Sequence, residues 1–141
     1  MSTYDWHREI VSEIVQHLDG KYRVRAPYNL PGQTRESALY QPDIVVFDKE
    51  TGELRYIIEV ETSSGGKSVA GATILAEVCV AQTKQRLKPS LFFIVKDDGE
   101  EHELEKLRKR IQLIRYSLKQ PILDKVIIQR KQEFISGIGA L

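Results

Sequence analysis

Length, composition and charge describe one ordinary globular domain and exclude several classes of protein. The chain has 141 residues, 41% of them hydrophobic and 29% charged, and no apolar run approaches the roughly 20 residues of a membrane span. Lysine and arginine number 21 against 20 acidic residues, so a nucleic acid partner would have to meet a local basic patch. Cys79 is the only cysteine, which excludes a disulfide within the chain and fits a reducing compartment. The N-terminus lacks the apolar segment of a signal peptide, so we expect a cytoplasmic protein with a single domain over residues 1–141.

The first predicted element is a helix over residues 3–18, with Ser2 or Thr3 available as N-cap. Glu13 lies on the flank of the apolar stripe of this helix, where it either faces the sheet or is solvated. His7 falls near the middle of the stripe, a position typical of a hydrogen-bonded core histidine rather than a ligand. The stripe consists of apolar residues at helical spacing: Trp6, Ile10, Val11, Ile14, Val15 and Leu18.

Residues 21–28 alternate and are predicted to form the first strand. The segment 29–40 contains Pro31 and Gly32 and is predicted to be a loop, with a short helical turn near its end. This loop leads toward the acidic residues described next. Arg35 is therefore a candidate phosphate contact, and the alternative is a solvated loop arginine.

Residues 41–61 contain two predicted strands joined by a tight turn. The unbroken apolar run over 44–47 is typical of a strand buried on both faces. The next strand alternates, and one of its faces is Leu54, Tyr56, Ile58 and Val60. Glu59 and Glu61 share the other face, roughly 7 Å apart because each strand residue adds about 3.3 Å.

The turn between these strands sets the position of Asp43. The turn sequence KETG fits a type I turn followed by a left-handed glycine, which predicts that Lys49 pairs with Glu53. Counting back along the ladder places Asp43 opposite Glu59, and paired residues face the same side. The sequence therefore predicts that three carboxylates, including that of Glu61, converge on one surface.

Carboxylates on one surface repel one another and favour protonation unless a positive charge joins them. A divalent cation is the simplest such charge, and oxygen ligands at this density suit Mg²⁺ or Mn²⁺. The alternative is a solvated acidic strand end. These acids close an apolar strand, which favours the metal.

The segment after Glu61, TSSGGKS, is similar to the end of a phosphate-binding P-loop. That motif requires a glycine five residues before its second glycine, and Glu61 occupies that position. We therefore reject a P-loop. Lys67 then remains as a loop lysine that is either solvated or directed into the acidic site.

A second helix is predicted over residues 68–87, and a buried strand over 91–95 follows it. The expected core contacts of this helix are Ile74, Leu75, Val78, Cys79 and Leu87.

A third helix is predicted over residues 102–119, and its polar side is the densest basic stretch of the chain. Such residues are usually a solvated face. The alternative is a nucleic-acid surface, for which Arg108, Lys109 and Arg110 are the candidates. A last strand over 125–129 precedes an apolar tail, 131–141, which docks either on the core or on another subunit.

The predicted order is α-β-β-β-α-β-α-β. Three strands in a meander, followed by helical crossovers to further strands, predict an α/β fold with a mixed central sheet flanked by helices. The predicted core extends from residue 3 to about residue 130.

The acidic residues also carry a resemblance to a known family. Pro42-Asp43, a gap of fifteen residues, and Glu59-Val60-Glu61 resemble the motif of the PD-(D/E)xK nuclease superfamily. That superfamily includes restriction endonucleases, archaeal Holliday junction resolvases and RecB-type exonucleases. Glu61 stands where the family has a lysine, an E-x-E variant. The resemblance covers the whole predicted core and implies a restriction-endonuclease-like fold.

The resemblance implies a metal-dependent phosphodiesterase acting on DNA, most simply an endonuclease. Asp43, Glu59 and the carbonyl of Val60 would hold one or two Mg²⁺ or Mn²⁺ ions, which polarise the scissile phosphate. Glu61 would act as general base or second-metal ligand. Glu13 would be the outer ligand that the first helix often supplies in this family.

Further positions follow from the same resemblance. Gln82 matches most closely a glutamine that RecB-like relatives carry on the second helix. Lys67 or Lys84 would replace the missing lysine. The small size fits a resolvase-like homodimer.

Two other functions remain open. One is a nuclease-fold DNA-binding module that has lost catalysis, as the missing lysine suggests. The other is a protein-interaction domain that uses the third helix and the apolar tail, with incidental carboxylates.

Overall fold

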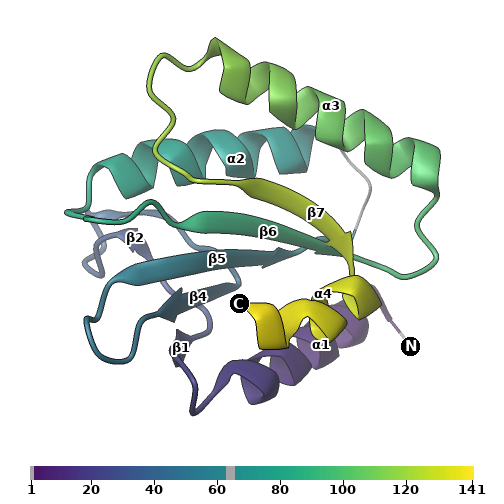
Figure 1. The fold of residues 1–141 in the computed structure, drawn as a ribbon, viewed down its shortest axis with the longest axis horizontal. Coiled ribbons are helices and arrows are strands. Elements are labelled where there is room, and N and C mark those ends of the chain that lie inside the picture. The colour runs from purple at the N-terminus through teal and green to yellow at the C-terminus, as the bar shows by residue number, and fades with distance from the viewer. Residues whose placement is uncertain (1, 63–65) are drawn as a thin grey trace.

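A computed structural model describes residues 2–62 and 66–141 and shows a mixed five-stranded sheet between two layers of helices (Figure 1). Helices α2 and α3 cover one face of the sheet, and α1 and α4 cover the other. No helix in these residues is long and apolar enough to cross a membrane. The elements are α1 (Thr3–Leu18), β1 (Arg23–Arg25), β2 (Leu30–Pro31), β3 (Ala38–Tyr40), β4 (Ile44–Phe47), β5 (Leu54–Val60), α2 (Gly66–Ala81), β6 (Ser90–Val95), α3 (Glu101–Ser117), β7 (Val126–Arg130), α4 (Lys131–Gly137) and the 3-10 turn η1 (Ile138–Ala140).

The strand order of the sheet is β1-β4-β5-β6-β7. Strands β1, β4 and β5 are antiparallel neighbours, whereas β5, β6 and β7 run parallel. Parallel neighbours need long crossover connections, and α2 and α3 provide them. The carboxyl ends of β5, β6 and β7 therefore lie together at one edge of the sheet, beside the start of α1 (Figure 1).

The sheet separates two apolar cores. Alternate residues such as Ile57 and Phe93 pack under α2 and α3, and Ile58 and Phe92 pack under α1 and α4. Strand β6 is buried along its whole length because it lies inside the sheet with helices on both sides.

The predicted α/β class and mixed sheet are confirmed, one small sheet was not predicted, and the tail takes one of its two predicted positions. Residues 29–40 are not a simple loop with a helical turn, because β2 and β3 pair there as a small separate sheet. The apolar tail docks on the chain's own core. It forms α4 and η1, and its Phe134 and Ile138 are buried with the side chains of α1.

Several predicted boundaries shift for local reasons. Strand β1 is shorter than predicted because only three residues pair with β4 at the sheet edge. Helix α2 begins at Gly66, so Lys67 belongs to its first turn, and part of the predicted loop, residues 63–65, lies outside the described residues. The helix ends at Ala81, earlier than predicted. Beyond that end, the Gln85 side chain accepts a hydrogen bond from the Leu54 amide at 3.2 Å.

The predicted hairpin pairing is wrong at the turn but correct at the acidic end. The Asp48 amide donates to the Glu53 carbonyl, so Asp48 rather than Lys49 opposes Glu53. Gly52 has the predicted left-handed conformation, with φ +72°. A bulge in β5 at Arg55 then restores the register, because it adds one residue between the pairs that Phe47 and Val46 make. The bulge also turns Leu54 to the face of Ile57, opposite to the prediction.

The prediction for the core face of α2 is also largely wrong. Cys79 is buried, but Ile74, Leu75 and Val78 point outward, and Leu87 beyond the helix is exposed. The residues that face the sheet are mostly smaller: Val69, Thr73, Ala76, Cys79 and Val80.

Candidate functional site

Asp43, Glu59 and Glu61 lie where β4 begins and β5 ends, and we call these three residues the acidic edge. Two hydrogen bonds hold the side chain of Glu59 there. Its Oε1 accepts from the amide of Asp43 at 2.9 Å, and its Oε2 accepts from the hydroxyl of Tyr40 at 3.0 Å. The register set by β4 and β5 explains the first bond, because the pair of Ile44 with Ile58 places the preceding residue of β4 opposite Glu59. The predicted neighbourhood of Asp43 and Glu59 is therefore present.

The Asp43 side chain in turn binds the backbone of the β5 strand. Its Oδ2 accepts from the Val60 amide at 2.8 Å, while its Oδ1 lies 3.0 Å from Nε2 of His7 on α1. Each of the two acids thus anchors the backbone of the neighbouring strand, and α1 is tied to the same point. His7 has a polar partner, as predicted, but it is partly exposed rather than in the core, and that partner is a candidate site residue.

Burial and the nearby charge of Asp43 raise the pKa of Glu59 to about 8. The hydrogen bonds from the Asp43 amide and the Tyr40 hydroxyl oppose this shift, and the charge of Glu61 adds to it. The same environment raises the pKa of Tyr40, mainly by burial and then by the charge of Glu59. Glu59 therefore carries a proton for much of its time near neutral pH. Among the described residues, no lysine or arginine forms an ion pair with Asp43 or Glu59.

Glu61 extends the acidic edge toward a pocket of about 400 Å³. The pocket has an apolar wall that includes Leu104 and Leu107, and its rim carries Lys96 and several acids. Its lining residues are Glu61, Thr62, Val95, Lys96, Asp98, Gly99, Glu100, Glu103, Leu104 and Leu107.

The predicted convergence of three carboxylates is incomplete. No group of three or more His, Cys, Asp and Glu side chains within residues 2–62 and 66–141 has an arrangement that could hold a metal ion. Two strand rises separate Glu59 from Glu61, and Asp43 is turned toward the Val60 amide and His7. The structure thus brings two acids into direct contact and places the third at the neighbouring pocket.

Three other predicted site residues lie elsewhere. Glu13 pairs with Lys131 of α4 at 3.2 Å rather than with the acidic edge. Gln82 and Lys84 follow the end of α2, next to Gln85, which bonds the first residue of β5. Since the acids close that strand, these two residues lie at its opposite end.

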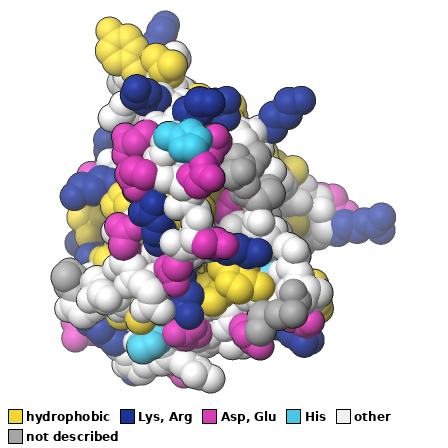
Figure 2. Space-filling view, turned by 90° about the vertical axis from the view of Figure 1, so that its right-hand side faces the viewer, with side chains coloured by type: hydrophobic (Ala, Val, Ile, Leu, Met, Phe, Trp, Pro, Cys, Tyr) yellow, Lys and Arg dark blue, Asp and Glu magenta, His cyan; other side chains and the backbone are white. Residues whose placement is uncertain are grey.

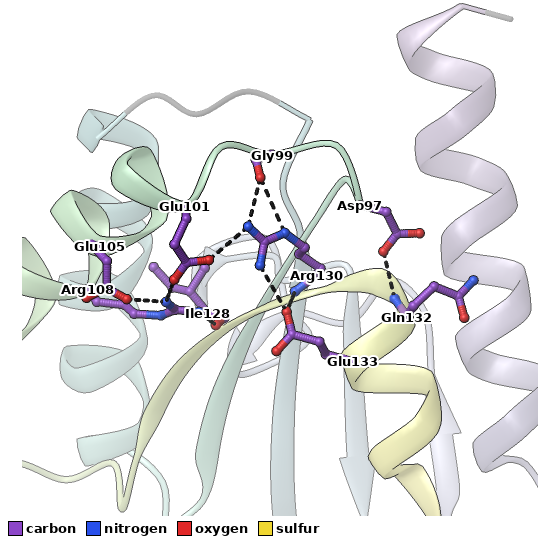
Figure 3. A network of polar contacts seen from close by, with 9 residues as sticks. All are labelled: Asp97, Gly99, Glu101, Glu105, Arg108, Ile128, Arg130, Gln132 and Glu133. Atoms are coloured by element: carbon purple, nitrogen blue, oxygen red, sulfur yellow. Dashed lines mark hydrogen bonds and ion pairs between the residues drawn. The ribbon is translucent and has the colours of Figure 1, made fainter.

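The basic side of α3 is partly committed to internal contacts (Figure 3). Arg108 donates to Glu101, to Glu105 and to the carbonyl of Ile128, and so ties α3 to β7. Arg130 donates to the Gly99 carbonyl and to Glu101, which fixes the loop that forms one side of the pocket. Arg108 is therefore a structural residue, and its charge is already balanced by two acids.

The other predicted cations are exposed. Arg110 lies directly against Gly66 at the start of α2, where an added Cβ would collide with its guanidinium group. Lys67 is the next residue of α2 and is exposed, so Arg110 lies against the helix turn that carries Lys67. Lys109 is exposed on α3, and Arg35 is exposed in the turn between β2 and β3.

Two residues of the acidic edge and its pocket were not predicted from the sequence, and a third was predicted to lie in the core. Tyr40 and Lys96 had no motif to mark them, and His7 was assigned to the apolar stripe. Lys96 follows β6, lines the pocket of Glu61 and places its ammonium 5.2 Å from the ring centre of Trp6 on α1. The position of Lys96 just after a buried parallel strand was the one available signal, because such ends gather at one sheet edge.

Figure 2 views the molecule from this edge, where acidic and basic side chains are interleaved and apolar side chains show between them. Comparisons of this chain with models of protein families, with curated proteins and with solved structures gave no match.

Proposed function

We propose that the chain is a metal-dependent phosphodiesterase that acts on DNA as an endonuclease, with Asp43 and Glu59 as its metal-binding acids. One observation carries this proposal. A half-buried Glu59 with a pKa of about 8 is held against Asp43, and no lysine or arginine of the described chain balances the pair. A divalent cation would provide the missing positive charge.

The donor chemistry of the pair fits Mg²⁺ or Mn²⁺. Both ions prefer carboxylate and carbonyl oxygens, which Asp43, Glu59 and the Val60 carbonyl offer. Each carboxylate oxygen accepts one hydrogen bond or ion pair here and keeps a further lone pair. When bound, the ion would supply polarisation of a phosphate and activation of water.

The chain's own residues would then hold the acids and the substrate in place. His7 fixes Asp43, and the Tyr40 hydroxyl fixes the orientation of Glu59. Glu61, which lines the pocket, would accept a proton from attacking water or bind a second ion. Lys96 borders the same pocket and would offer the positive charge that the family's lysine provides. We propose it ahead of Lys67 and Lys84 for that role.

Asparagine in place of Asp43 should reduce Mg²⁺-dependent cleavage of DNA at least about 100-fold, or about 2.7 kcal/mol of activation free energy. The change removes the charge but preserves an oxygen for the Val60 amide. The measurement is the initial rate on single-stranded, duplex and branched DNA with Mg²⁺ or Mn²⁺. Glu13→Gln is the matched control, because Glu13 of α1 pairs with Lys131 of α4 and not with the proposed metal-binding acids. Equal rates for the parent and Asp43→Asn would remove the proposed site.

Alanine at both Lys67 and Arg110 should weaken DNA binding for all sequences and reduce the slope of log K against log salt by about 2. Arg110 lies against Gly66 at the start of α2, and Lys67 is the next residue of that helix. The slope is measured by fluorescence anisotropy across a salt series. Lys84→Ala together with Lys88→Ala removes two exposed cations beyond the other end of α2 and should leave the slope unchanged. A slope that drops equally in both double variants would indicate nonspecific attraction by net charge.

A second candidate is a nuclease-fold DNA-binding module without catalysis. The observation that favours it is the completeness of the hydrogen bonding: every oxygen of Asp43 and Glu59 already has a partner in the chain. Acids that lock two strands and a helix together have a structural role without metal. Cleavage assays with and without Mn²⁺ separate the two candidates, since only the enzyme turns over DNA and only the enzyme needs the ion for turnover.

Other features of the proposal are a resolvase-like role as a homodimer and a cytoplasmic location. The interaction-domain alternative loses part of its surface, because Phe134 and Ile138 of the tail are buried in the chain's own core.

A further inference from the structure

The outward side of α2 carries an apolar surface that the fold does not use. Ile74, Leu75 and Val78 are 47%, 43% and 53% exposed. Gly71 is exposed one turn earlier on the same side of the helix. We call these four residues the α2 outer face. Surface helices of globular proteins usually direct charged or polar residues to solvent, so this face departs from the expected pattern.

The four residues of the α2 outer face are uncharged, and the exposed Lys67, one turn before Gly71, marks the end of this uncharged stretch. The exposed residues from 68 to 82, all of them described, are Ser68, Gly71, Ile74, Leu75, Val78, Ala81 and Gln82. Glu77 is the one charged residue in this span, and it is buried against α3. A partner that presents charges here would leave them desolvated without counter-charges. The face therefore suits a partner surface that is itself apolar and uncharged.

Gly71 supplies an independent observation. Glycine in a helix interior costs up to about 1 kcal/mol relative to alanine. A Cβ added at Gly71 would meet nothing within 4 Å, so packing within the chain does not require glycine there. A small residue on a helix surface allows another helix to approach closely. The glycine is explained if a second backbone crosses α2 at this point.

We infer that the α2 outer face packs against the same face of a second copy of this chain. An uncharged apolar surface is complementary to itself, as a two-fold symmetric interface requires. The net charge of +1 at pH 7 gives two copies almost no mutual repulsion. A contact made chiefly by one helix is small, which predicts a dimer that dissociates in the micromolar range. This inference assigns an interface to the homodimer proposed above, and its test does not depend on the nuclease activity.

Sedimentation velocity over low to high micromolar protein tests the inference. The parent should shift from monomer to dimer over this range. Val78→Glu and Ile74→Glu should weaken the dimer at least about 100-fold, because each buries charge in the interface. Leu113→Glu is the matched control: Leu113 is an exposed leucine on α3, and its variant should dimerise like the parent. Circular dichroism verifies that each variant is folded.

Gly71→Leu adds a readout that a merely solvated helix would not give. The space around Gly71 is open within one chain, so leucine should raise the stability of the monomer through its better helix propensity. The same side chain should weaken the dimer by blocking close approach. A parent that is monomeric at every concentration overturns the inference and leaves the face to a different partner. A parent dimer that survives Val78→Glu and Ile74→Glu overturns it as well.

Discussion

Alanine in place of Glu77 should lower the free energy of unfolding by about 3–5 kcal/mol, because it leaves the partly buried Arg115 without its charged partner. Glu77 is 5% exposed and lies 3.4 Å from Nε of Arg115. Its Oε2 also accepts from the amides of Ile122 and Leu123, at 2.6 and 3.2 Å. Arg115 in turn donates to the carbonyls of Leu123 and Asp124. One carboxylate thus joins α2, α3 and the segment that leads into β7.

Urea unfolding of three variants measures this effect. Glu77→Gln keeps an acceptor for the two amides but loses the charge, so its loss of stability should be intermediate. Glu105→Ala removes a carboxylate from the exposed ion pair with Arg108 and should cost less than about 1 kcal/mol. If Glu77→Ala and Glu105→Ala lose equal stability, the Glu77–Arg115 pair does not hold these elements together.

The stability of the parent should decrease as the pH rises from about 5 to about 8, and Glu59 should be a main cause. A glutamate in an unfolded chain titrates near pH 4.3, whereas the folded pKa is about 8. Between these values the folded state holds a proton that the unfolded state has released. Stability then falls by up to about 1.4 kcal/mol per pH unit, a few kcal/mol in total.

Unfolding of the parent and of Glu59→Gln across this pH range measures the contribution. Glutamine is neutral at every pH, so the stability of the variant should rise relative to that of the parent as the pH increases from about 5 to about 8. Millimolar Mg²⁺ at the alkaline end should stabilise the parent and leave Glu59→Gln unchanged, since an ion favours the deprotonated acid. Parallel curves for both proteins would contradict the burial of a protonated Glu59. Parallel curves with and without Mg²⁺ would contradict the metal site alone.

The α/β class and the neighbourhood of Asp43 and Glu59 could be predicted because both depend on short-range patterns. Strand alternation sets the face of Glu59, and pairing within one hairpin sets its partner. The predicted turn was wrong by one residue, and the bulge at Arg55 compensated for it. The predicted register at Asp43 and Glu59 is therefore correct because the one-residue error at the turn and the one-residue bulge cancel.

The remaining features depend on contacts between distant segments. Helix α2 is apolar on almost every side, so its periodicity cannot distinguish the sheet-facing residues from Ile74, Leu75 and Val78. Tyr40 and His7 reach the acidic edge only after β3 and α1 have packed. The two cations at the start of α2 come from segments more than forty residues apart, Lys67 and Arg110.

The bulge at Arg55 separates the tip of the hairpin mechanically from the acidic edge. Pairing is regular between Val46 and Ile44 and their partners in β5, and the irregularity is confined to the turn side. Residues added between Asp48 and Glu53 would then be accommodated before they reach the paired segment. The hairpin tip is a suitable place to graft a reporter peptide or an affinity tag, because the alignment of Asp43 with Glu59 would be retained.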